Sequence, residues 1–193
     1  MSKIIVYIEA PGHPGWRELL RRGVHVPVAR AMGMNVFLTE ALGLSPGYVQ
    51  DEVRTIFLNA HPVDDLGGAV VCGGDVVGLG AAMPGMVGIT MRRESPLAVF
   101  REDISSKETD GGSQSGGRVL VKLFNTVARD AAATVLSRGV SAPAASVLRI
   151  LSDQCAPECI VEVEGASAGR RALQRDAEQG ADVLLAAKLQ GES

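Results

Sequence analysis

The chain has 193 residues, of which 46% are hydrophobic and 21% charged, as in an ordinary globular protein. Its net charge of −3 argues against a protein that wraps nucleic acid through a basic face. The sequence has no apolar run of about 18 residues, so we expect no membrane span. Three scattered cysteines favour a reducing compartment, the cytoplasm, over a disulfide scaffold.

The beginning of the chain predicts a strand followed by two helices. Residues 3–8, KIIVYI, are mostly β-branched or aromatic, which is typical of a buried strand. Residues 15–23 place Trp16, Leu19 and Leu20 at helical spacing, with charged side chains on the other side. Residues 26–44 predict a helix in their later portion.

Turn-forming residues divide the next segment into a helix and short strands. Ser45 is suited to an N-cap and Pro46 to the first helical position. Residues 59–65, NAHPVDD, predict a turn. The strands that we predict here are residues 53–59, 75–83 and 86–93.

Residues 105–117, SSKETDGGSQSGG, are polar and rich in glycine and serine, which predicts a flexible linker or a long surface loop. The linker divides the chain into residues 1–104 and residues 118–193. In the second part the predicted strands are 118–124, 159–165 and 181–189, and the predicted helices are 126–139, 141–153 and 167–180.

Residues 55–85 combine strands and turns in a recognisable order. The order FLN, PVDD, GGDVVGL and MPG resembles the second half of the ubiquitin-like β-grasp sulfur carriers of molybdopterin and thiamine synthesis. The residues at matching positions are Asn59, Gly74, Asp75 and Val76. In those carriers a diglycine ends the chain and becomes a thiocarboxylate, whereas Gly85 is followed by Met86 and much further chain. The resemblance therefore implies a β-grasp-like fold without the carrier activity.

The elements together predict an α/β or α+β protein with a mixed sheet. A β-grasp-like unit with added helices is expected within residues 1–104, and a strand–helix–strand unit within residues 118–193. Two arrangements stay open: the second unit forms a domain of its own, or the two units complete one domain.

The glycine-rich stretch 71–88 permits two interpretations. Glycine allows tight turns and close contact between main chains, and it also lines phosphate-binding loops. The glycine spacing matches no phosphate-loop motif. We therefore favour main-chain packing and expect no bound cofactor.

The best candidate for an anion-binding or partner-binding site is Pro84, Gly85, Arg92 and Arg93. Two adjacent arginines after an apolar segment are suited to clamp a carboxylate or a phosphate. More often such a pair belongs to a solvated rim. Methionine and arginine beside apolar residues are also typical of a subunit contact.

Metal or redox sites receive weaker support. Cys155 and Cys159 form a C-x₃-C pair with no second ligand pair nearby, so we favour two ordinary thiols over a zinc or redox site. His13 and His61 lie in His-Pro turns, and together with Asp64 or Asp65 they offer an alternative metal site. We favour plain turns here too, and we expect Cys72 to lie in the core.

The leading functional prediction is a non-catalytic cytoplasmic protein that binds a protein partner or forms a homo-oligomer, and binds neither nucleic acid nor a membrane. The sequence shows no dense set of titratable residues, no phosphate loop and no metal-ligand quartet. The alternative is a cofactor-binding accessory protein or a small-molecule enzyme that uses residues 78–93 and the arginine pair.

Overall fold

The structure is a computed structural model that describes residues 4–93, 95–96, 115–153, 159–163, 166–167 and 169–187. The described strands form a ten-stranded sheet in the order β11-β10-β1-β12-β9-β2-β8-β7-β4-β5 and a small sheet of β3 and β6. Parallel and antiparallel pairs occur side by side in the large sheet. The predicted α/β class with a mixed sheet is confirmed.

The strands are β1 (Ile4–Ile8), β2 (Val24–Arg30), β3 (Met32–Gly33), β4 (Thr55–Leu58), β5 (His61–Pro62), β6 (Val70–Val71), β7 (Val76–Gly80), β8 (Ser115–Leu123), β9 (Val140–Pro143), β10 (Cys159–Val163), β11 (Ala166–Ser167) and β12 (Asp182–Ala187). The helices are α1 (Pro14–Arg22), α2 (Met34–Val36), the π-helical turn η1 (Phe37–Ala41), α3 (Pro46–Asp51), α4 (Gly85–Met91), α5 (Asn125–Asp130), α6 (Ala132–Ser137), α7 (Ala144–Leu151) and α8 (Gly169–Glu178).

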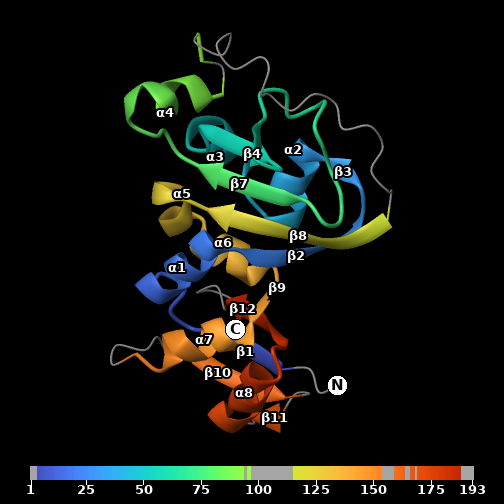
Figure 1. Cartoon of the computed structure of the whole chain (residues 1–193), viewed down its shortest axis with the longest axis vertical. Helices are drawn as coiled ribbons and strands as arrows, with labels where there is room; N and C mark the ends of the chain where they lie inside the picture. Colours follow the sequence, from blue (N-terminus) through green and yellow to red (C-terminus); the bar gives the residue numbers. More distant parts are fainter. Residues whose placement is uncertain are drawn as a thin grey trace.

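One half of the large sheet consists of β2, β8, β7, β4 and β5 and occupies the upper part of the molecule in Figure 1. β8 pairs antiparallel with β2 and parallel with β7. Helix α2 and η1 supply Met34, Phe37 and Leu38 to the buried core. β8, which lies between β2 and β7, comes from the part of the chain that follows residue 114.

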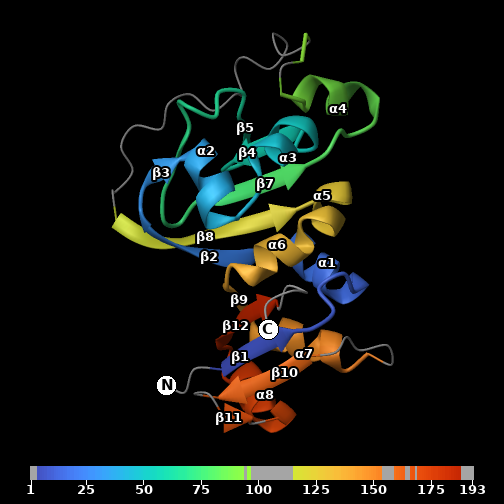
Figure 2. The ribbon, with the colours of Figure 1, turned by 180° about the vertical axis from the view of Figure 1, so that it is seen from behind.

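The other half consists of β9, β12, β1, β10 and β11 and lies in the lower part of Figure 1. β1 pairs parallel with β12 and antiparallel with β10. Helices α7 and α8 pack against each other and against these strands, as Figure 2 shows from behind. Each half of the sheet thus contains strands from both sides of residues 105–114.

The two halves meet where β2 pairs with β9 through His25 and Ser141. Helix α1 lies beside this junction and packs against α5, α6 and α7 (Figure 2). Its inner face buries Trp16, Leu19 and Leu20, as its sequence pattern predicts. The fully buried Trp16 is therefore part of a core shared by both halves.

Several predicted boundaries need correction. The strand predicted for residues 86–93 is wrong, because most of these residues form α4. Pro84 has no amide hydrogen with which to extend a strand, and its φ of −72° is suited to the start of a helix. Residues 115–117 begin β8 and are not linker. Residues 141–143 belong to β9, where pairing with β12 overrides the helical pattern.

Candidate functional site

The loop between β6 and β7 is a closed turn held by main-chain and side-chain hydrogen bonds. Asp75 Oδ2 accepts from the Cys72 amide at 2.7 Å, and Asp75 Oδ1 accepts from Asn59 Nδ2 at 2.8 Å. Asn59 Oδ1 in turn accepts from the Val76 amide at 2.9 Å. These bonds join the end of β4 to the start of β7. Asn59 and Asp75 therefore have a structural role.

The glycines of this turn allow the turn and β8 to touch through their main chains. A Cβ atom on Gly73 would lie 2.7 Å from the Cα of Gly117, a distance that real Cβ atoms do not reach. The Gly74 amide donates to the Arg118 carbonyl at 2.9 Å. The main-chain packing predicted for the glycine-rich stretch is therefore present here.

We expect Asn59→Ala to lower the free energy of unfolding by about 1–3 kcal/mol, because the Val76 amide and Asp75 would each lose a hydrogen-bond partner. Urea denaturation measures the change. Asn35→Ala is the control, since Asn35 is an exposed residue of the same type. A loss no greater than that of the control would contradict the structural role of Asn59.

Arg93, one of the predicted site residues, is buried and holds the end of α3. Its Nε donates to the Val53 carbonyl at 3.1 Å, and one of its terminal nitrogens donates to the Val49 carbonyl at 2.8 Å. Its amide donates to the Arg54 carbonyl at 2.8 Å. These contacts use the guanidinium to satisfy carbonyl groups at a helix end.

The structure distributes the other predicted site residues along α4. Pro84 is the N-cap and Gly85 the first residue of the helix, whereas Arg92 is the C-cap. Arg92 is half-buried. The arginine pair and the Pro84-Gly85 pair therefore lie at opposite ends of α4, and their role in anion or partner binding stays a prediction.

The outer surface of α4 is apolar and exposed. Met86 is 78% exposed, Val87 71% and Ile89 41%, and Pro84 is exposed beside them. We call these four residues the α4 surface. The chain carries no charged residue from Val76 to Met91. Contiguous exposed apolar patches of this kind mark binding sites more often than scattered apolar residues do.

Helix α4 is too weak to form through its own sequence. It spans seven residues, includes two glycines and several β-branched residues, and lacks a side-chain cap at its start. Isolated helices of this length are marginal in water. Gly88 is its one buried residue. The helix therefore gains little from the core, and its apolar side chains remain available.

Hydrogen bonds fix the chain at both ends of α4, which stands at the outer edge of the upper half in Figure 1. Before the helix, the Ala81 amide donates to Asn125 Oδ1 at 2.9 Å. After it, Arg93 makes the contacts to α3 described above. The α4 surface is thus presented from two fixed points.

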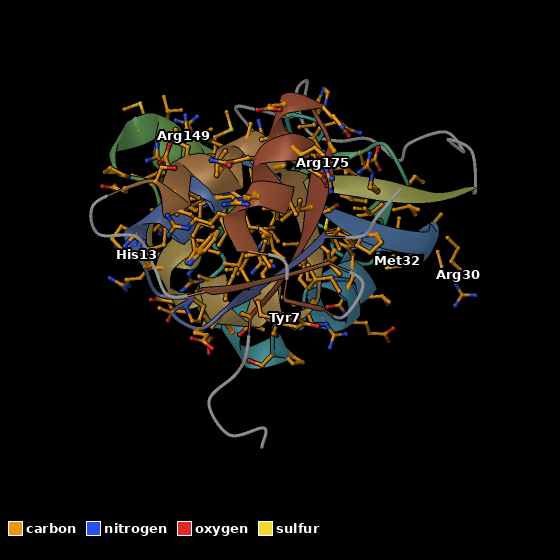
Figure 3. All side chains as sticks on the ribbon, turned by 90° about the horizontal axis from the view of Figure 1, so that it is seen from below. Tyr7, His13, Arg30, Met32, Arg149 and Arg175 are labelled. Atoms are coloured by element: carbon orange, nitrogen blue, oxygen red, sulfur yellow. The ribbon has the colours of Figure 1, made fainter. Side chains whose placement is uncertain are left out.

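Hollows flank the exposed side of α1. The first, with a volume of about 440 Å³, lies between α1 and α7 and includes His13 and Arg149, which Figure 3 shows on the same side of the molecule. His13 Nδ1 accepts from the Gly15 amide at 3.1 Å and caps the helix. The second hollow, of about 500 Å³, lies between α1 and the end of β8.

The comparisons give no relative from which a role could be carried over. No protein-family model, no curated protein and no solved structure matches this chain. None of the helices in the described ranges combines the length and the hydropathy needed to cross a bilayer.

The metal hypotheses receive no geometric support from the described residues. Within those residues no three His, Cys, Asp or Glu side chains gather as a metal ion requires. His13 caps α1, while His61 lies in the separate strand β5. Cys155 falls outside the described residues, and Cys159 is described in its β10 backbone alone. Cys72 is half-buried, so the expectation that it lies in the core is wrong.

Sequence reasoning named residues at both ends of helix α4 but missed the exposure of Met86, Val87 and Ile89 between them. The available signal was the absence of charge between Val76 and Met91 around a central proline and two glycines. The second hollow was missed because its walls come from α1 and from Phe124, which lie far apart in the sequence.

Proposed function

We propose that this chain is a non-catalytic cytoplasmic binding protein that associates with a second copy of itself through the α4 surface. The observation that carries the proposal is the exposure of Met86 and Val87, 78% and 71%, on a short helix. Methionine is enriched at protein interfaces, where its flexible side chain adapts to a partner.

A second copy is the favoured partner because the α4 surface carries no charge. A two-fold interface brings the same patch of both subunits together, so a charged patch would repel itself. Because no charged residue occurs from Val76 to Met91, two copies of this surface would not repel each other. The rigid attachment of α4 through Ala81 and Arg93 also reduces the entropy lost on association.

From the resemblance of residues 55–85 to the sulfur carriers, we take only the expected shape of this segment. The hairpin around Asn59 and Asp75 would serve as a frame that positions α4. No carrier activity is proposed, because Gly85 is followed by Met86 and not by a free carboxylate.

Light scattering after size exclusion, over a range of protein concentrations, tests this proposal. We expect the wild type to be a dimer and the double variant Met86→Glu/Val87→Glu to be a monomer with an unchanged circular dichroism spectrum. Burying one large apolar side chain contributes about 1.5–3 kcal/mol, so the dissociation constant should rise about 100-fold or more.

Val70→Glu supplies the matched control, because Val70 is 40% exposed on β6 and lies outside the α4 surface. This variant should remain a dimer. A wild type that stays monomeric at every concentration would overturn the proposal. So would a dimer that the double variant leaves intact.

A further inference from the structure

The second hollow beside α1 has the position of a ligand site in an α/β sheet. It lies where the parallel strands β7 and β8 end, since Leu79 pairs with Leu123 and the chain passes directly to Phe124 and Asn125. Ligands of open α/β sheets bind outside the carboxyl ends of the strands. Its volume of about 500 Å³ also lies in the range of small-molecule sites.

Phe124 provides a flat apolar surface in this hollow. Phe124 is 39% exposed and lines the hollow. A Cβ atom on Gly78 would lie 3.5 Å from the ring atom Cε2, so the ring is placed against the glycine-rich strand β7. Part of the ring is therefore supported by β7 and part faces solvent.

Asn125 adds a hydrogen-bond donor next to this ring. Its φ of +43° is a left-handed conformation, which asparagine adopts more readily than most residues. Its Oδ1 accepts from the Ala81 amide, which fixes the side chain. Within the described residues its Nδ2 has no hydrogen-bond acceptor, so this amide is available to a ligand.

The charged side chains of the hollow favour an anion. Arg17 and Arg21 are one helical turn apart on α1, and both line the hollow together with Glu18. Glu18 already accepts from Arg21 and from Arg22 at 3.1 Å each, and its hydrogen bond with Arg22 lowers the pKa of its carboxyl. Arg17 is half-buried, and its guanidinium makes neither a hydrogen bond nor an ion pair with the residues the structure describes.

We propose that this hollow binds a planar aromatic compound that carries an anionic group, of which a nucleoside monophosphate is the test case. The ring would stack on Phe124, and Arg17 and Asn125 would donate hydrogen bonds to the anionic group. This site is separate from the α4 surface, and the proposal does not depend on self-association.

Isothermal titration calorimetry with AMP tests the site on the full chain. Adenosine and inorganic phosphate, titrated separately, report the contributions of the ring and of the anion. We expect AMP to bind and each of the two parts to bind at least about tenfold more weakly, since both recognition elements are then incomplete.

Three variants locate the binding. Arg17→Gln should weaken AMP about tenfold, and Phe124→Leu, which keeps an apolar group beside Gly78, should weaken it several-fold. Arg149→Gln removes an exposed arginine from the other hollow and should leave the affinity unchanged. The proposal is overturned if AMP does not bind, or if Arg149→Gln weakens it as much as Arg17→Gln does.

Discussion

Trp16→Ala is expected to lower the free energy of unfolding by about 3–5 kcal/mol, the usual cost of truncating a large buried aromatic residue. Trp16 is fully buried on α1, at the junction of the two halves of the sheet. The cavity would therefore weaken the contact between the halves as well as the helix itself. Circular dichroism during chemical denaturation is the suitable measurement, since Trp16 is the single tryptophan and its fluorescence would be lost.

Trp16→Phe separates the contribution of ring packing from the cost of the buried Nε1 group. Within the described residues the Trp16 Nε1 group is buried and finds no hydrogen-bond acceptor. Phenylalanine keeps an aromatic ring and removes this unsatisfied donor, so the loss should be clearly smaller than that of Trp16→Ala. Equal losses for both variants would show that ring packing at the junction is not the main contribution of Trp16.

Arg93→Met is expected to lower the free energy of unfolding by about 2–4 kcal/mol. The change leaves the Val49 and Val53 carbonyls without their donor, and an unsatisfied buried polar group costs about 1–3 kcal/mol. Arg93→Lys should recover part of this loss at most, because one ammonium group does not reproduce the planar fork of the guanidinium. Urea denaturation of both variants measures the two effects.

Arg54→Met is the control for Arg93, since Arg54 is a neighbouring arginine with an exposed side chain. The free energy of unfolding of the Arg54→Met variant should differ from that of the wild type by less than about 0.5 kcal/mol. If Arg93→Met were as stable as the wild type, the structural role of Arg93 would be wrong. The role in anion binding predicted from the sequence would then regain support.

Local sequence signals predicted the elements whose residue pattern lies within one short segment. The strand at residues 3–8 was predicted from its β-branched and aromatic composition, and the helix over Trp16, Leu19 and Leu20 from the spacing of these residues. Ser45 caps α3 as its position before Pro46 indicates. These elements agree with the prediction because the residues that specify them lie within one or two turns of each other.

Strand pairing between distant segments could not be predicted in the same way. The segment Val24–Arg30 includes a proline and follows a helix, and it becomes β2 because β8 lies beside it. Residues 86–93 have strand-like composition, but the strand pattern ends at β7 and the chain turns into α4 at Pro84. Tertiary context decides both cases.

The candidate site shows the same division. The sequence identified Arg93 as a candidate anion-binding or partner-binding residue, but its burial against α3 depends on a fold that brings residue 93 to residues 49 and 53. The exposure of Met86 and Val87 likewise depends on how α4 leaves the body of the protein. Side-chain chemistry was visible in the sequence, whereas the direction in which each side chain points was not.

Each half of the sheet combines strands from both parts of the chain, and this arrangement has a consequence for synthesis on the ribosome. β1 is made before the other described strands, yet its parallel partner β12 is the last of them to be made. β2 likewise waits for β8. β1 and β2 therefore lack these partners until the later strands have been made, and exposed strand edges favour aggregation during that time. Efficient production of this protein in cells should therefore depend on chaperones that shield nascent chains.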